Sequence, residues 1–138
     1  MKWLRFLSVG LLAVFFIVAG INHFRDPAVY LGMMPKWLPW PDKLQLLAGA
    51  AEVAGGLGVL IPAVRRWAAW GLLLLLVAVF PANLQVALHG WPGAPFAVSP
   101  WILWARLPLQ AVLMAWVWWT FLKRGGPREG RHSVDPIP

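Results

Sequence analysis

Cysteine is absent from the 138 residues of this chain, and only five residues are acidic. Without cysteine the chain cannot carry out dithiol exchange, which many small membrane proteins of oxidising compartments use. Charged residues make up 12% of the sequence and apolar residues 60%, far from the balance of soluble domains. The sequence also lacks a haem, flavin or iron–sulfur signature, so the chain cannot move electrons unaided. These features favour a membrane protein over a self-sufficient soluble enzyme.

Four long apolar segments occupy most of the chain. They cover residues 4–22, 44–61, 67–88 and 101–122. At a rise of about 1.5 Å per residue, each helix would cross or nearly cross a hydrocarbon core of about 30 Å. A soluble helical bundle is the alternative, but its helices would keep a polar stripe. We predict an all-α fold, an integral membrane four-helix bundle over residues 1–125, followed by a disordered cytoplasmic tail over residues 126–138.

The first apolar segment also allows a second interpretation, as a cleaved signal peptide. Lys2 and Arg5 precede it, and small residues stand near its end at Ala19 and Gly20. The apolar run is longer than that of a typical signal peptide, and it leads directly into polar residues. We therefore expect a retained helix.

Basic residues gather at one set of helix ends. They precede the first segment, fill the link between the second and third, and follow the fourth: Lys2, Arg5, Arg65, Arg66, Lys123, Arg124, Arg128 and Arg131. By the positive-inside rule these ends and both termini are cytoplasmic, which predicts a multi-pass membrane protein. The net charge of +7 accompanies no nucleic-acid recognition motif, so we expect the lipid bilayer as partner and no nucleic acid.

The two loops assigned to the outer side are rich in proline and tryptophan. Residues 24–42 contain four prolines, and residues 89–100 contain three. Segments this apolar and this rich in proline are expected to lie on the outer interface and to cap the bundle.

Two charges stand inside the apolar segments, where an unpaired ionisable group costs several kcal/mol. Glu52 lies roughly 12 to 15 Å from the outer end of its segment, and Arg106 lies roughly 8 Å from the outer end of its own. The two side chains can therefore approach one another. The pair could be a structural clamp that fixes helix register, or part of a functional site.

Other polar residues fall at a similar depth once the orientation is applied. Asn22 and His23 end the first segment on the outer side, Asn83 lies near the outer end of the third, and Gln110 lies one turn below Arg106. Polar groups from all four segments thus predict a cavity or a buried hydrogen-bonded network in the outer half. His23 has no second ligand at metal-binding spacing, so we expect no metal site.

The order of several short motifs resembles the DoxX-like family of small bacterial membrane proteins. The motifs, which extend over nearly the whole chain, are AGINHF at 19–24, MPKWLP at 34–39, Gly49 with Glu52 and Gly55-Gly56, Pro62 with Arg65-Arg66 and AAWG at 68–71, VFPAN at 79–83, and RLPLQ at 106–110. The resemblance implies a four-helix bundle in a bacterial inner membrane. It also implies association with membrane redox complexes or oxidative-stress defence, because the name-giving member is a subunit of a thiosulfate:quinone oxidoreductase. Cysteines that would carry sulfur chemistry are absent here, which argues against a thiosulfate role.

Two functions are therefore expected from the sequence. In the first, the outer-half pocket binds a quinone or another amphipathic molecule. Arg106 and Gln110 would donate hydrogen bonds to its oxygen, Glu52 would hold Arg106 or exchange protons, and Asn22, His23 and Asn83 would orient the head group. The chain would then be a subunit or accessory of a redox assembly. In the second, it is a non-enzymatic scaffold or assembly partner, with a structural Glu52–Arg106 cluster, and it could be a homo-oligomer.

Overall fold

A computed structural model describes residues 2–123 of the chain, so the tail predicted at 126–138 lies outside the described residues. Residues 2–123 fold into helices and contain no strand. Their elements, in chain order, are α1 (Lys2–Arg25), α2 (Pro27–Leu31), α3 (Pro41–Gly58), α4 (Arg65–Ala78), α5 (Phe80–His89), α6 (Pro100–Val117) and the π-helical turn η1 (Trp118–Leu122). The prediction of an all-helical fold is confirmed for this range.

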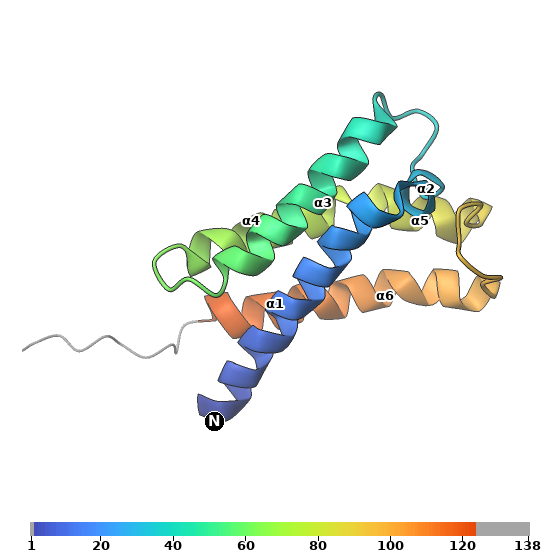
Figure 1. The fold of residues 1–138 in the computed structure, drawn as a ribbon. Coiled ribbons are helices and arrows are strands. Elements are labelled where there is room, and N and C mark those ends of the chain that lie inside the picture. The colour runs from blue at the N-terminus through green and yellow to red at the C-terminus, as the bar shows by residue number, and fades with distance from the viewer. Residues whose placement is uncertain (1, 124–138) are drawn as a thin grey trace, which may run out of the picture.

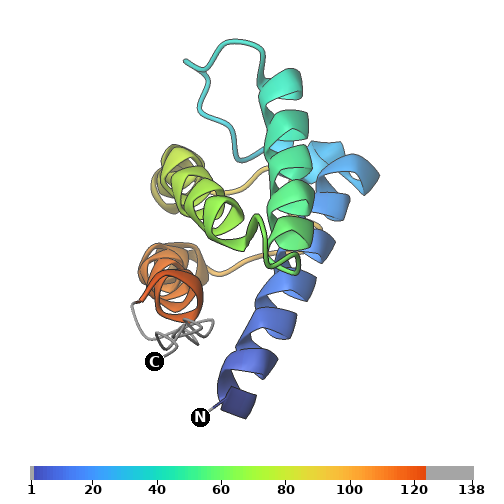
Figure 2. The same ribbon diagram turned by 90° about the vertical axis from the view of Figure 1, so that its left-hand side faces the viewer.

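The helices form two pairs that cross one another. α1 packs along α3, while α4 and α5 follow one another in a line beside α6 (Figure 1). In Figure 2, α4 and α6 point nearly along the line of sight whereas α1 and α3 are seen from the side. The short helix α2 follows α1 and packs against α1 and α3. The molecule thus has one end with α2 and the α5–α6 loop, and an opposite end with the N-terminus and the α3–α4 loop.

Three helical stretches have the length and composition to cross a membrane. They are Lys2–Arg25, Arg65–His89, which combines α4 and α5, and Pro100–Leu122. The membrane character predicted from the sequence is supported by these three. α3 ends at Gly58, earlier than the expected 61, and includes Asp42, Lys43 and Glu52 among its 18 residues. It is not one of the three stretches.

Proline begins four of the helices. Pro27, Pro41, Pro81 and Pro100 occupy the first turns of α2, α3, α5 and α6. Proline suits this position because its fixed φ matches the helix and the missing N–H would have no partner there. At Pro81 the effect is a break in the predicted segment 67–88, with Val79 as the junction of α4 and α5. The loop expected at 24–42 also contains α2, which the sequence reading missed.

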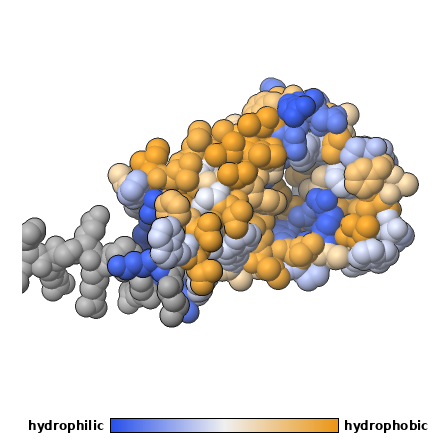
Figure 3. Space-filling view, turned by 60° about the horizontal axis from the view of Figure 1, so that its bottom comes forward, coloured by the Kyte–Doolittle hydropathy of each residue, from blue (hydrophilic) through white to orange (hydrophobic). Residues whose placement is uncertain are grey.

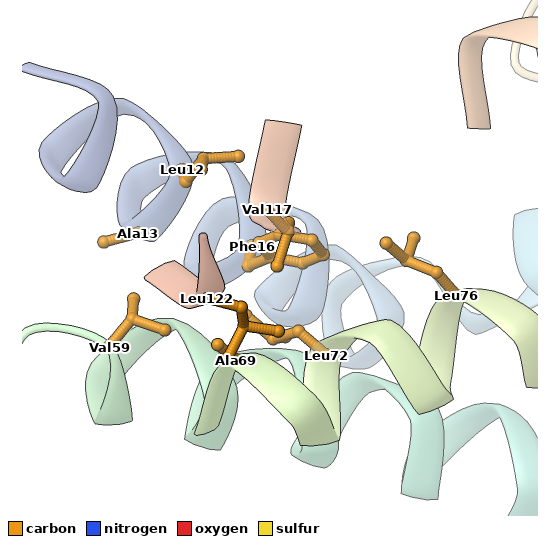
Figure 4. Close-up of a cluster of buried hydrophobic side chains, with 9 residues drawn as sticks. All are labelled: Leu12, Ala13, Phe16, Val59, Ala69, Leu72, Leu76, Val117 and Leu122. Carbon is orange, nitrogen blue, oxygen red and sulfur yellow. The ribbon is translucent and has the colours of Figure 1, made fainter. Parts of the chain in front are cut away.

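A buried apolar core joins the two pairs at the N-terminal end of the molecule. Figure 4 shows Phe16 of α1, Leu72 of α4 and Val117 of α6 turned toward one another. All three side chains are almost fully buried. Many other apolar side chains of the chain are exposed, including Trp3, Leu74 and Trp101. An apolar exterior around a small core is what a helical membrane protein requires.

Close contact between α1 and α3 depends on glycine. A Cβ placed on Gly49 would lie 2.5 Å from Cβ of His23 and 3.0 Å from the carbonyl oxygen of Gly20. A Cβ on Gly20 would in turn lie 2.7 Å from the carbonyl oxygen of Gly49. Small residues at such crossings let two helix backbones approach. The contact brings the C-terminal half of α1 against α3 at the height of His23.

Candidate functional site

His23, on the last turns of α1, contacts two polar side chains of α3. Its Nδ1 lies 3.2 Å from Oε1 of Gln45, and its Nε2 lies 3.3 Å from Oε2 of Glu52. All three residues are largely buried: the side chains of His23 and Glu52 are 9% and 15% exposed, and Gln45 is 2% exposed. Gln45 and Glu52 are seven residues apart, which is two helical turns, so they share one face of α3.

The contact between His23 and Glu52 leaves one carboxylate oxygen without a hydrogen bond. Oε2 of Glu52 is within ion-pair distance of the imidazole, but within residues 2–123 it has no hydrogen-bond partner and almost no exposure. A buried acceptor in this state costs free energy comparable to a lost hydrogen bond. Because this oxygen is buried against the imidazole, the contact with His23 is what compensates it.

A second polar group lies on the other helix pair. Nη2 and Nε of Arg106 lie 3.1 and 3.3 Å from Oδ1 of Asn83, and Nδ2 of Asn83 donates to Oε1 of Gln110 at 2.7 Å. Nε2 of Gln110 donates in turn to the carbonyl oxygen of Leu76, next to the helix break. Each amide is therefore held in one orientation. The result is a fixed Arg106 side chain on α6, supported from α5 and α4.

α2 and residues 90–99, here called the outer cap after the side predicted for them from the sequence, cover this second group. The indole of Trp91 donates to the carbonyl oxygen of Val29 at 2.7 Å, and the guanidinium of Arg106 lies 4.8 Å from the centre of the Trp91 ring. This geometry is that of a cation–π contact. Gly93 lies so close to α2 that a Cβ on it would be 2.4 Å from the carbonyl oxygen of Ala28. The cap is therefore closed over Arg106.

Tyr30 connects the two polar groups. Its ring stacks on the imidazole of His23, with the centroids 3.6 Å apart and the planes at 20°. Burial raises the pKa of the Tyr30 phenol above its ordinary value of 10.0, and the Glu52 carboxylate raises it as well. The Arg106 guanidinium and a hydrogen bond with Asn22 lower the pKa in opposition. Both charges therefore act on the same phenol, although one lies on α3 and the other on α6.

An apolar groove leads to Tyr30 along α1. Val14, Phe15, Val18 and Ala19 line its length, and Asn22 and Tyr30 form its polar end. Its volume is about 360 Å³, at the lower end of the range for sites that hold small molecules. Figure 3 shows a hollowed face of the molecule in which hydrophilic surface appears within largely hydrophobic surroundings. An apolar groove with a polar end suits a ligand with a tail and a head.

The structure departs from the expected pairing of Glu52 with Arg106. Glu52 is paired with His23, and Arg106 is bonded to Asn83, so the two predicted partners form no ion pair with each other. The physical reason is the packing of the helices, since α1 brings His23 against α3 and α5 brings Asn83 against α6. Gln110 is occupied by Asn83 and Leu76, and so supports Arg106 instead of facing a ligand. Asn22 is exposed at the end of the groove.

Sequence reasoning missed several residues of the site. Gln45, which the sequence did not assign to the site, is buried and contacts His23. The seven-residue spacing of Gln45 and Glu52 was the signal that could have joined them. Tyr30 lies in the one-turn helix α2, and Met33 and Trp91 lie in loops, so no helical period in the sequence reveals their positions. Among residues 2–123 no group of three His, Cys, Asp or Glu side chains is arranged to hold a metal ion.

Comparison with known proteins assigns the chain to a family. Residues 12–121, most of the chain, match the family described as Domain of unknown function (DUF8561). The chain therefore belongs to that family. Nothing among curated proteins or solved structures matches it.

Proposed function

We propose that the chain is a membrane protein of four spans, with α3 as the fourth. α1 runs from the N-terminal end of the molecule to the α2 end, and α4 begins again at the N-terminal end (Figure 1). If the stretches containing α1 and α4 both cross the bilayer, α3 has to return across it. Its 18 residues extend over about 27 Å, close to the thickness of a hydrocarbon core. The contact of Glu52 with His23 lowers the cost of its charged residue.

The charge distribution supports an orientation with both termini in the cytoplasm of a bacterium and the outer cap outside. Lys2, Arg5, Arg65 and Arg66 all stand at the N-terminal end of the molecule. Because the chain has no cysteine, single cysteines can report this directly. In intact spheroplasts, Lys36→Cys and Ser99→Cys should react with a membrane-impermeant maleimide, whereas Arg66→Cys should react only after permeabilisation. Labelling of Arg66→Cys from outside would instead indicate three spans.

The function that the geometry supports best is binding of an amphipathic small molecule. The observation that carries it is the apolar α1 groove, whose polar end includes Tyr30; the ring of Tyr30 stacks on His23, the partner of Glu52, and belongs to the outer cap that covers Arg106. The groove would hold a tail, while Asn22 and Tyr30 would face the head. Asn83, Gln110, His23 and Gln45 would hold the charged groups in place. The resemblance to DoxX-like proteins favours a quinone as this ligand, and a redox or stress-related membrane assembly as its setting.

A scaffold without a ligand is the second candidate. It is favoured by the number of polar side chains that are satisfied by one another, since the bonds of His23 join α1 to α3 and those of Asn83 join α5 to α6. Such networks can specify a packing arrangement without binding anything. In this case the two charged residues would contribute to stability alone.

Organic extraction of the protein, purified gently from its native membrane, separates the two candidates. Mass spectrometry would compare small molecules retained by the wild type, Glu52→Gln and Arg106→Gln. Arg66→Gln is the matched control, because Arg66 is exposed and stands at the opposite end of the molecule. An amphiphile retained near one per chain by the wild type and the control, and lost from both site variants, supports binding. Bulk lipid in equal amounts from all four proteins supports the scaffold.

A further inference from the structure

The groove along α1 is lined by uncharged side chains. Its residues are Val14, Phe15, Val18, Ala19, Asn22 and Tyr30. The five that belong to α1 recur at the spacing of a single helix face. Within the described part of the chain, neither an acidic nor a basic side chain is among them.

The two charged side chains of the candidate site have partners outside the groove. Oε2 of Glu52 lies 3.3 Å from Nε2 of His23. The guanidinium of Arg106 bonds to Asn83 and lies against the ring of Trp91. Neither charge lines the groove, so neither compensates an ionised head group there.

The polar end of the groove offers neutral hydrogen-bonding groups. Burial raises the pKa of the Tyr30 phenol above 10.0, so the phenol keeps its proton at physiological pH. The phenol and the amide of Asn22 can each donate and accept. An uncharged head with an oxygen atom exchanges its hydrogen bonds with water for bonds with these groups. An ionised head would lose hydration without meeting an opposite charge, which costs much more.

The groove opens to the side of the molecule. Val14 is near the middle of the membrane-length stretch Lys2–Arg25, and Asn22 is near its end. The side chains of Val14, Phe15 and Val18 are each at least half exposed. With α1 across a bilayer, the open side faces hydrocarbon and the polar end lies toward the head groups. A molecule dissolved in the bilayer can therefore enter from the side and lie parallel to the lipids.

The size of the groove suits one hydrocarbon chain. At the helical rise, the nine residues from Val14 to Asn22 extend over about 12 Å. Spread over that length, the volume of about 360 Å³ leaves a cross-section of about 30 Å². A phospholipid, with two chains side by side, would not fit within it.

We propose that the groove takes a single-chain amphiphile whose head is uncharged and carries an oxygen atom, and that it rejects ionised heads. This inference rests on the proposed function and specifies the charge and the chain number of its ligand. Long-chain alcohols, monoacylglycerols and quinones with one tail belong to this class. Phospholipids and ionised fatty acids do not.

Methyl decyl sulfone and decanesulfonate are the appropriate probes, because their heads are similar in shape and differ in charge. Saturable binding of each to the full chain in phosphatidylcholine nanodiscs would be measured by equilibrium dialysis, with empty nanodiscs subtracted. Each affinity would be expressed relative to the concentration of the probe in the bilayer. We expect the wild type to bind the sulfone at least about tenfold more tightly than the sulfonate.

A change of charge at the polar end should change this preference. Asn22→Lys places a cation beside the head, so affinity for the sulfonate should rise at least about tenfold. Misfolding cannot produce such a gain of binding. Asn22→Gln is the matched control, because it keeps a neutral amide and should keep the preference for the sulfone.

A second pair of variants tests the position of the tail. Ala19→Leu fills the groove and should weaken binding of the sulfone at least about tenfold. Ala54→Leu makes the same change at an exposed position of α3 outside the groove lining, and should leave the affinity unchanged.

The outcomes separate the inference from the proposed function. Equal affinities in the wild type, or tighter binding of the sulfonate, would overturn the selection for an uncharged head and leave an amphiphile site in place. An unchanged ratio in Asn22→Lys would place the head elsewhere and would also overturn the inference. A phospholipid retained near one per chain in the native extract, and lost from Ala19→Leu, would overturn the single chain. Absence of saturable binding for both probes would overturn the inference, and together with only bulk lipid in the native extract it would overturn the proposed function as well.

Discussion

The imidazole of His23 and the ring of Tyr30 lie face to face, 3.6 Å between their centroids. The contact joins the end of α1 to the short helix α2, and it places the phenol where both Glu52 and Arg106 act on it. Tyr30 is also the single tyrosine of the chain, so its ionisation can be followed without interference from another phenol.

The pKa of Tyr30 should therefore report the two charges of the site. Burial and Glu52 raise it above 10.0, so the tyrosinate absorbance should appear at higher pH in the folded protein than in the denatured chain. Glu52→Gln should lower the midpoint and Arg106→Gln should raise it further. Because the folded state keeps its phenolic proton longer, the stability associated with Tyr30 is complete below pH 10 and declines as pH rises through the folded pKa. Identical midpoints in all three proteins would contradict the placement of the two charges around Tyr30.

Replacement of Gly49 by alanine should separate α1 from α3. The added Cβ would lie 2.5 Å from Cβ of His23, so we expect a loss of about 1–3 kcal/mol in the free energy of unfolding. Gly71→Ala is the matched control, because a Cβ there meets nothing within 4 Å. In a helix interior this control should be neutral or stabilising by up to about 1 kcal/mol. Denaturation in detergent followed by circular dichroism measures both, and a Gly49→Ala protein as stable as Gly71→Ala would argue against the close helix contact.

Asn83→Ala should destabilise the second helix pair. The change leaves both Arg106 and Gln110 without the partner that orients them, and each unsatisfied buried group costs about 1–3 kcal/mol. Ser99→Ala removes a polar side chain that makes no capping hydrogen bond, and should leave the thermal midpoint unchanged. Equal midpoints for the two variants would show that the Arg106–Asn83–Gln110 chain contributes nothing.

Arg5→Gln should loosen the contact between the first and last helical turns of the described range. Nε of Arg5 donates to the carbonyl oxygen of Thr120 at 2.9 Å, and Nη2 lies 3.4 Å from that of Lys123. Such bonds satisfy carbonyl groups that a helix end leaves open. We expect a loss of about 0.5–1.5 kcal/mol for the shorter bond, measured by unfolding in detergent. Lys2→Gln removes an equal charge and controls for the effect of charge on membrane insertion.

The helical fold could be predicted from the sequence because apolar runs and prolines act locally. The runs ending near Asn22 and Leu122 became helices close to their expected bounds. The break at Val79 follows from Pro81, but the bond of Gln110 to the carbonyl oxygen of Leu76 could not be predicted. That bond depends on how α6 is rotated about its axis relative to α4, which no local sequence pattern reveals.

The sequence predicted most of the residues that belong to the candidate site, but not which of them bond to one another. Depth along the helices correctly brought Glu52 near His23, and Arg106 near Asn83 and Gln110. Which of them pair is decided by which helices pack together, α1 with α3 and α5 with α6. The sequence of a single helix does not reveal its neighbours. Their opposite charges predicted an ion pair between Glu52 and Arg106. In the structure Glu52 instead contacts His23, and Arg106 bonds to Asn83.

The contact between Gly32 and Gly93 predicts which residues relatives in this family can carry at these two positions. A Cβ on Gly32 would lie 2.5 Å from the backbone nitrogen of Gly93, and one on Gly93 would collide with the carbonyl oxygen of Ala28. Neither position tolerates even a methyl group while the two outer segments stay in contact. Relatives that keep both glycines should share the closed outer cap. A relative that has replaced one of them should have changed both segments together.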